Sequence, residues 1–207
     1  MGRAFSDLAF TADVRAEQVR MGSRGAYARL DDAPDARNTL TPREAAYIES
    51  RDGFYQASVS QTGWPYVQFR GGPAGFLKVL DDHTIAYADL RGNRQYVSVG
   101  NLHGNDRVAL ILMDYARQQR LKILGRVKIV AAADNAALIA RLVPPATKVP
   151  VERAVLIDVQ AFDWNCPQHI TPRLTQAEIE TVVSPLHDEI ARLKRQLMQA
   201  RAAAARS

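Results

Sequence analysis

Seven short segments with β-type sequence, separated by turns of hairpin size, dominate the middle of this chain. Residues 54–60 alternate in the manner of a strand, and Gln61-Thr62-Gly63 forms a short turn into residues 64–70. Such closely spaced strands favour antiparallel neighbours over βαβ units. We therefore predict a mainly β (α+β) fold, an antiparallel barrel with a few peripheral helices and a C-terminal helix. The remaining strand-like segments are residues 76–80, 84–88, 108–113, 121–130 and 154–162.

For two of these segments, the residue pattern predicts which faces of the strand are buried. Residues 108–113 form an unbroken apolar run, which is typical of a central strand covered on both faces. Residues 121–130 alternate cleanly, so one face should be basic and the other apolar. The basic face consists of Lys122, Arg126 and Lys128, and the apolar face of Leu121, Ile123, Val127 and Ile129.

Capping signals predict where helices begin. Thr41 and Glu44 form a capping box around Pro42, so a helix should run from here to about residue 50. Weaker signals predict two more helices, at residues 95–104 and 134–142, the second capped by Asp134. Residues 1–38 show no clear periodicity, and we expect them to wrap around the surface or a partner subunit.

The composition is that of an ordinary globular protein. The 207 residues are 47% hydrophobic and 24% charged, which suits one domain with a buried core. A net charge of +5 fits either a polyanion partner or a small phosphate site with a basic tail. The single cysteine, Cys166, excludes an internal disulfide framework. Dense early charges, and the lack of an apolar run of about 18 residues, predict a cytoplasmic protein without a membrane partner.

The segment from residue 84 to residue 95 carries the clearest binding signal. A short apolar strand reaches Ala88, and the polar turn Arg91-Gly92-Asn93-Arg94-Gln95 precedes the predicted helix. A junction of strand, turn and helix gathers backbone N–H groups and side-chain donors, which a phosphate group needs. Ordinary solvated turns have the same composition, so the residues alone leave both interpretations open.

The strand at residues 64–70 has one polar face. Period-two alternation places Tyr66, Gln68 and Arg70 on that face. Val67 and Phe69 lie on the other face. The polar face is either a solvated surface or the wall of a polar ligand site.

A polar loop with two prolines follows the last predicted strand, at residues 164–173. Cys166 and His169 have a spacing found in metal sites, but two ligands are too few for structural zinc. A catalytic Cys–His pair would lack an orienting group. The loop either satisfies its own polar groups or forms one rim of a planar ligand. In the second case Trp164 would stack on the ligand, and Gln168 or Arg173 would donate hydrogen bonds.

The C-terminal segment is rich in Ala, Leu, Arg and Lys. Ser184 followed by Pro185 predicts a helix start here. Its apolar residues step by 4, 3, 4, 3 and 4, a coiled-coil seam that should pack on a symmetry mate or on the barrel. The excess of basic residues could contact nucleic acid, but a solvated helix face explains it better. The seam consists of Ile179, Val183, Leu186, Ile190, Leu193 and Leu197.

Taken in order, these features resemble the pyridoxamine 5'-phosphate oxidase-like FMN-binding split-barrel family. The resemblance covers roughly residues 40–173, and the segment from Asp163 to His169 is similar to the subgroup labelled flavin-nucleotide-binding. It implies an antiparallel split barrel that forms a two-fold homodimer, with FMN in each of two grooves at the interface. The matching features are the Thr41 helix start, the hairpin, Gln68-Phe69-Arg70, Phe76-Leu77-Lys78, Tyr87, Arg91-Gly92-Asn93-Arg94, the next helix and Asn105-Asp106 before Val108-Ala109-Leu110.

The resemblance also implies the residues that bind the cofactor. Lys78, Asn93 and Arg94 would hold the FMN phosphate. Trp164 and Arg173 would approach the flavin or substrate across the dimer. The full set of expected cofactor-binding residues is Gln68, Arg70, Lys78, Tyr87, Ala88, Asn93, Arg94, Trp164, Gln168 and Arg173.

Two departures from the family pattern qualify this expectation. Gln95 follows Arg94 where the oxidase has a lysine, so that turn lacks one positive charge. The substrate-side Arg-x-His motif is absent as well. FMN binding is still expected, whereas both departures argue against oxidation of pyridoxamine phosphate.

We predict three parts: an N-terminal extension at residues 1–38, an FMN-binding split-barrel domain at 39–173 and a C-terminal helical extension at 174–207. The leading hypothesis is an FMN-dependent oxidoreductase that acts on a small-molecule substrate with a nicotinamide electron donor. Flavin chemistry requires no triad or metal cluster from the protein, and no such motif is recognisable in the sequence. The alternatives are an FMN-carrying or haem-handling binding or stress protein of the same fold, and a nucleic-acid-associated barrel.

Overall fold

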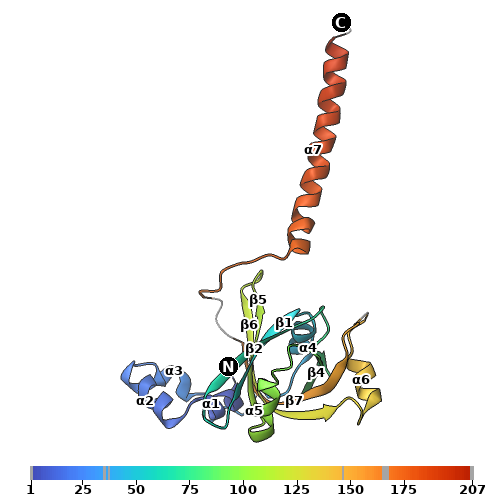
Figure 1. Ribbon diagram of the computed structural model, residues 1–207. Helices are drawn as coiled ribbons and strands as arrows, with labels where there is room; N and C mark the ends of the chain where they lie inside the picture. The colour runs from blue at the N-terminus through green and yellow to red at the C-terminus, as the bar shows by residue number, and fades with distance from the viewer. Residues whose placement is uncertain (1, 35, 37, 146, 165–167, 206–207) are drawn as a thin grey trace.

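A computed structural model describes residues 2–34, 36, 38–145, 147–164 and 168–205. These residues form one antiparallel sheet of seven strands in the order β2-β1-β5-β6-β7-β4-β3 (Figure 1). The predicted antiparallel architecture is thereby confirmed. The strands are β1 (Gly53–Val59), β2 (Pro65–Gly71), β3 (Lys78–Val79), β4 (Thr84–Leu90), β5 (Arg107–Asp114), β6 (Gln119–Ala131) and β7 (Val151–Trp164).

The sheet curves until strands that are distant in its order meet around one core. Three strands separate β1 from β4, so a flat sheet would hold them about 19 Å apart. The rings of Phe54 on β1 and Tyr87 on β4 nevertheless lie 5.5 Å apart, centroid to centroid. The intervening strands bury Leu112, Ile123 and Ile157 in the same core. This contact therefore requires a sheet that is rolled into a barrel.

Helices cover the outside of the barrel. Helix α1 packs on β7, and α6 packs on β4 and β7. Helix α7 projects away from the barrel, as Figure 1 shows. The helices are α1 (Arg3–Ala9), α2 (Ala12–Arg20), α3 (Arg24–Ala28), α4 (Pro42–Glu49), α5 (Val97–Gly104), α6 (Ala136–Leu142) and α7 (Gln176–Ala204).

The structure corrects two predictions about the barrel. β5 is central, between β1 and β6, but it is not covered on both faces, because Arg107 and Ala109 are exposed. Only one face of β5 packs in the core, so the apolar residues on its other face are not explained by burial in this chain. The strand predicted at residues 76–80 is reduced to the two residues of β3.

Three helix predictions also change. The N-terminal segment without periodicity contains α1, α2 and α3. Helix α6 is capped by Asn135, whose side chain accepts a hydrogen bond from the Leu138 N–H at 3.0 Å, rather than by Asp134. Helix α7 begins after Thr175 with a capping box to Glu178, so Pro185 lies inside the helix and does not begin it.

One buried carboxylate joins α4 to the end of β7. Glu44 completes the predicted capping box with Thr41, whose backbone N–H donates to Glu44 at 3.2 Å. The other carboxylate oxygen accepts a hydrogen bond from the Trp164 indole N–H at 2.6 Å. Burial disfavours the charged form, but these hydrogen bonds outweigh it and lower the pKa of Glu44.

Replacing Glu44 should therefore have a pH-dependent cost. Glu44→Gln should lower the free energy of unfolding by about 1.5–3 kcal/mol near pH 7, because the hydrogen bonds lose their charged acceptor. Since the pKa of Glu44 is lower in the folded state, its contribution is present above the unfolded pKa of about 4.3 and disappears as the pH falls through the folded pKa. Urea titrations at pH 7 and pH 3 should show a large and then a small difference from the wild type.

The exposed Glu180→Gln is the matched control and should change neither titration. An equal loss of stability for Glu44→Gln at both pH values would show that the charge of Glu44 contributes nothing.

Candidate functional site

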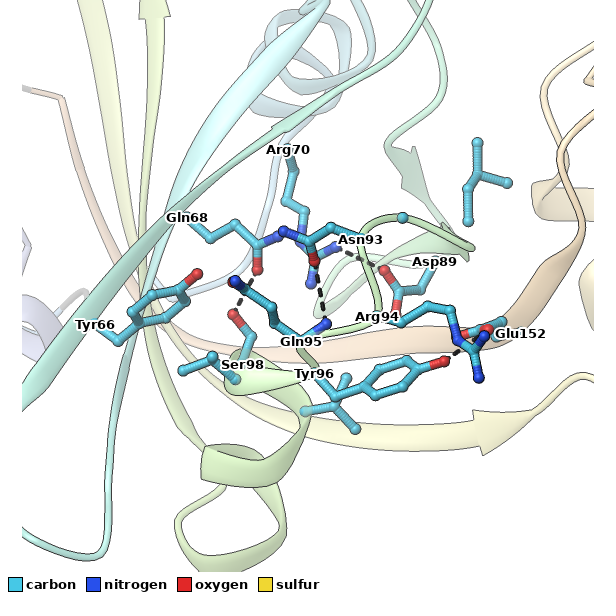
Figure 2. Close-up of a pocket in the computed structure, with 14 residues that line it drawn as sticks. Tyr66, Gln68, Arg70, Asp89, Asn93, Arg94, Gln95, Tyr96, Ser98 and Glu152 are labelled. Atoms are coloured by element: carbon cyan, nitrogen blue, oxygen red, sulfur yellow. Dashed lines mark hydrogen bonds and ion pairs between the residues drawn. The ribbon is translucent and has the colours of Figure 1, made fainter.

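A polar cavity lies where β2 faces the end of β4 and the start of α5 (Figure 2). Its volume is about 230 Å³. β2 contributes Tyr66, Gln68 and Arg70, and the turn after β4 contributes the residues from Gly92 to Tyr96. Segments that are more than twenty residues apart in sequence thus enclose one cavity, which we refer to as the β2–α5 cavity.

The backbone around this cavity is built to present N–H groups. Tyr96, the residue before α5, has a left-handed conformation with φ of 52°, and its side chain does not cap the helix. Arg94 is also left-handed, with φ of 63°. Left-handed backbone at residues other than glycine costs free energy and often marks functional turns. The first residues of α5, Val97, Ser98 and Val99, line the cavity, so an uncapped helix N-terminus borders it.

Two polar side chains of β2 are held in place by partners across the cavity. Gln68 accepts a hydrogen bond from the Ser98 hydroxyl at 2.8 Å. Arg70 forms an ion pair with Asp89 at 2.7 Å. The side chain of Asn93 accepts from the Gln95 N–H at 3.1 Å and so stiffens the turn. Figure 2 shows these groups converging on the same space. The polar face of β2 is therefore a cavity wall and not a solvated surface.

Carboxylates hold most of the arginines around this cavity. The buried Asp89 pairs with Arg70 and also lies 3.5 Å from Arg153. Glu152 accepts hydrogen bonds from Arg91 at 3.1 Å and from the Tyr96 hydroxyl at 3.0 Å. Desolvation opposes ionisation of Glu152, but these donors lower its pKa, so the carboxylate stays charged.

Arg94 differs from the other arginines. In the described part of the chain it forms no ion pair and no side-chain hydrogen bond, although it lines the cavity. Its guanidinium is therefore available to an anionic ligand without displacing an internal partner. A free guanidinium beside an uncapped helix N-terminus is suited to bind a phosphate.

The structure brings Gln68, Arg70, Asn93 and Arg94 together, as the resemblance implied. Tyr87 and Ala88 line a neighbouring cavity of about 340 Å³. The two cavities are adjacent, because Arg70, Asp89, Leu90 and Gly92 line both of them. Tyr87 is buried and donates a hydrogen bond to Gln56 at 2.9 Å. Burial raises the pKa of Tyr87 to about 12, so this hydroxyl remains a donor at neutral pH.

The other expected residues lie elsewhere. Lys78 is on β3 and does not line the β2–α5 cavity. Trp164 packs edge-on against Tyr47 at 4.6 Å, and the Arg43 guanidinium lies 4.5 Å from its ring. Gln168 is exposed. Cys166, half of the Cys–His pair considered for zinc or nucleophilic catalysis, lies outside the described residues.

The sequence did not single out four residues of the site: Asp89, Tyr96, Ser98 and Glu152. Asp89 was missed because β4 extends to Leu90, two residues beyond the predicted strand end. Ser98 lies in the first turn of α5, and this position could have identified its hydroxyl as a hydrogen-bond donor. Glu152 reaches the site through the pairing of β7 with β4, where Leu90 faces Val151, and no local pattern indicates this.

A second feature lies on the opposite side of β2. Its outward residues are apolar and exposed, with exposed fractions of 59% for Val67 and 57% for Phe69. The ring of Phe69 lies over the backbone of Gly53, where an added methyl group would be 2.4 Å from it. We call this surface the outer apolar face. It comprises Tyr55, Ala57 and Val59 of β1, Pro65, Val67 and Phe69 of β2, and Ala109 and Ile111 of β5, which are neighbours in the strand register.

Arg173 borders the outer apolar face. It lines an open cavity of about 540 Å³ together with Tyr55, Phe69 and Tyr115. Its guanidinium lies 5.1 Å from the centre of the Tyr115 ring. The structure thus places Arg173 beside the outer apolar face and away from the residues that line the β2–α5 cavity.

Metal and membrane features are limited. Within the residues that the structure describes, no three His, Cys, Asp or Glu side chains come together as a metal site would require. None of the described helices is long and apolar enough to cross a membrane.

The model of the pyridoxamine 5'-phosphate oxidase family matches residues 40–164 of the chain. A histidine-to-alanine variant of HupZ from group A Streptococcus has a similar structure, with a TM-score of 0.50, 16% identity, and coverage of 61% of this chain and 99% of that one. At this identity the similarity concerns the fold. No curated protein sequence matches the chain.

Two further solved structures align with lower scores. One is a Lactobacillus delbrueckii protein provisionally named a pyridoxamine 5'-phosphate oxidase, with a TM-score of 0.48, 20% identity, and coverage of 61% of this chain and 94% of that one. The other is an FMN-binding protein from Syntrophomonas wolfei, with a TM-score of 0.44, 12% identity, and coverage of 74% and 95%.

Proposed function

The chain belongs to the pyridoxamine 5'-phosphate oxidase family, and from this premise we propose that it binds FMN and acts as an oxidoreductase on a small molecule. The phosphate of FMN would occupy the β2–α5 cavity. One observation carries the proposal: Gln68 and Arg70 meet Asn93 and Arg94 around a cavity in which Arg94, among the described residues, is without an internal partner. These are four of the residues expected to bind the cofactor.

The residues present fit a phosphate. Arg94 would donate charge-assisted hydrogen bonds, each contributing about 1.5–3 kcal/mol. The N-terminus of α5 adds a partial positive charge of about half a unit and free N–H groups. Arg70 would approach the same anion while Asp89 fixes its orientation. The role of Lys78 as a further phosphate ligand stays a prediction.

The chemistry of the reaction would come from the isoalloxazine ring of bound FMN, which accepts and donates electrons. The protein has to bind and orient the flavin and exclude water. This division of labour agrees with the lining of the β2–α5 cavity, where the lowered pKa of Glu152 suits a structural carboxylate and not a general acid. The same observation favours a second candidate, an FMN-carrying protein without turnover.

The site is incomplete within one chain. A cavity of about 230 Å³ is smaller than the roughly 300–1,000 Å³ of typical ligand pockets. It can hold the phosphate end of FMN, so the ring needs further walls. We propose that a second copy pairs through the outer apolar face, an exposed patch of the kind that marks interaction sites. Because β2 is an edge strand of the sheet, that copy would reach around its edge and supply the missing walls. Such a homodimer would carry Arg173 of one copy toward the cofactor of the other.

Absorbance spectroscopy of the full-length protein tests the function. Mixed with FMN, the protein should give the shifted spectrum of bound flavin, and NADH or NADPH should bleach it, with recovery in air. If the protein does not bind FMN, the proposed function is wrong. Binding without bleaching by either donor would favour the FMN-carrying protein.

Arg94→Gln tests the position of the phosphate. It should weaken FMN binding by about ten- to a hundredfold, because one charge-assisted contact is lost. Riboflavin, which has no phosphate, should bind the wild type and the variant equally. Fluorescence quenching titrations measure both. Arg141→Gln on α6 removes the same charge elsewhere and should change neither value; a similar effect of both substitutions would mean that only net charge matters.

Val67→Asp tests the proposed dimer face. Burial of Val67 on both copies is worth about 3 kcal/mol in total, so the substitution should weaken self-association by about a hundredfold and FMN binding with it. Sedimentation equilibrium measures the first effect. Val19→Asp, at a similarly exposed valine on α2, is the control. Unchanged association of Val67→Asp would exclude the outer apolar face as the interface.

A further inference from the structure

Helix α7 is long, regular and without a buried residue of its own. It spans Gln176–Ala204, 29 residues, and none of them is buried. Figure 1 shows it extending away from the barrel. A single helix of this kind is marginal in water, because most helix stability in proteins comes from packing of an apolar face. A capping box at Thr175 and Glu178 nevertheless fixes its start. The chain thus specifies this helix while leaving its apolar face uncovered.

The apolar face of α7 has the spacing of a coiled coil. Ile179, Leu186, Ile190, Leu193 and Leu197 are 47–58% exposed, although they form one stripe with Val183. The steps of 4 and 3 residues give a heptad repeat, with Val183, Ile190 and Leu197 at position a. Ile179, Leu186 and Leu193 then occupy position d. We name these six residues the α7 seam.

We propose that the α7 seam pairs with the same seam of a second copy in a parallel, two-stranded coiled coil. β-branched residues at a with leucine at d favour two parallel strands. The four central positions of the seam, from Val183 to Leu193, follow this rule, whereas Ile179 and Leu197 at its two ends do not. A parallel pair has a two-fold axis along its length, so it is compatible with a homodimer. This surface is separate from the outer apolar face and does not depend on FMN.

The charges beside the seam agree with the parallel arrangement. Glu189 occupies position g, and Lys194 occupies the following position e. In a parallel pair, g of one helix faces the next e of its partner. Glu189, which pairs with Arg192 in its own helix, would therefore also meet Lys194 of the second copy, twice in the dimer. An antiparallel pair would instead set position e against e and position g against g, so Glu189 would not face Lys194. Pro185 lies at the outward position c and leaves the seam free.

Other occupants fit less well. Five of the six seam residues are exposed and Val183 is half-buried, so the barrel leaves most of the seam uncovered. A nucleic acid would require free basic groups, but Arg192 is held by Glu189 at 2.6 Å. Lys194, Arg195 and Arg201 remain as a basic set, and the test below includes them.

Two substitutions on α7 provide a matched test in the full-length protein. Leu193→Glu places a charge in the seam. Met198→Glu places the same charge at an outward apolar residue, 64% exposed. Both sites are exposed in the single chain, so neither change should unfold the barrel. We expect Leu193→Glu to raise the dimer dissociation constant at least tenfold in sedimentation equilibrium and to reduce the helical signal at 222 nm. Met198→Glu should do neither.

The same pair is then repeated on a Val67→Asp background, so that the outer apolar face cannot mask the result. There, residual dimer should persist, vanish with Leu193→Glu and survive Met198→Glu. Identical association of the Leu193 and Met198 variants on both backgrounds would overturn the proposal, whatever happens to FMN binding.

Disulfide trapping tests the orientation independently. A parallel pair brings the two copies of Ala200, at position d, side by side. Ala200→Cys, in a chain carrying Cys166→Ser, should therefore form a disulfide-linked dimer on mild oxidation. Failure to cross-link would overturn the parallel arrangement. Salt-sensitive binding of double-stranded DNA, lost on replacing Lys194, Arg195 and Arg201 by Ala without any effect of Leu193→Glu on dimerisation, would replace the proposal with a nucleic-acid role.

Discussion

Both surfaces of functional interest on the barrel depend on the way β2 presents its side chains. A half-buried strand normally turns its apolar residues to the core. In β2 the polar residues Gln68 and Arg70 face inward, and Val67 and Phe69 face outward. Because side chains alternate strictly, a slip of one residue would exchange these faces. The register is fixed by the hairpin, in which the Ser60 N–H donates to the Trp64 carbonyl at 3.0 Å and Gly63 has φ of 83°.

An inward arginine is tolerable only with a partner, and this requirement shapes the electrostatics of the cavity. Removing a charge from water costs several kcal/mol unless an opposite charge compensates. Asp89 pairs with Arg70 and Arg153, and Glu152 pairs with Arg153 and Arg91. These three arginines and two carboxylates together carry one net positive charge. Arg94 adds a second positive charge that no carboxylate of the described residues neutralises. The uncapped start of α5 adds a further partial positive charge at the same end of the cavity.

Local periodicity in the sequence predicted the strands and one helix. It did not predict contacts between segments that are distant in sequence. Alternation and turns identified the strands, and the Thr41 capping box identified α4. The same signature at Thr175 and Glu178 marks the start of α7. Ser184 and Pro185 gave a competing start signal, but Pro185 lies inside the helix, where a proline costs stability.

The partners of the site residues could not be predicted in this way. Trp164 meets Glu44, which is 120 residues away in sequence. Trp164, which the resemblance placed near the flavin, therefore links the end of β7 to α4 within the chain. Lys78 was expected near Arg94 because the resemblance assigns both to the FMN phosphate. It lies on β3, at the opposite end of the strand order from β2, a placement that no local pattern indicates.

On the proposed arrangement, cofactor binding and association are linked. A ligand that is enclosed by two subunits binds only the associated state, so its apparent affinity falls with the fraction of chains that are paired. Joining two weak contacts on one chain raises the effective concentration of the second once the first has formed. Pairing of α7 would therefore keep the outer apolar faces close at protein concentrations where those faces alone would separate. The helix would in this way support flavin binding without touching the flavin.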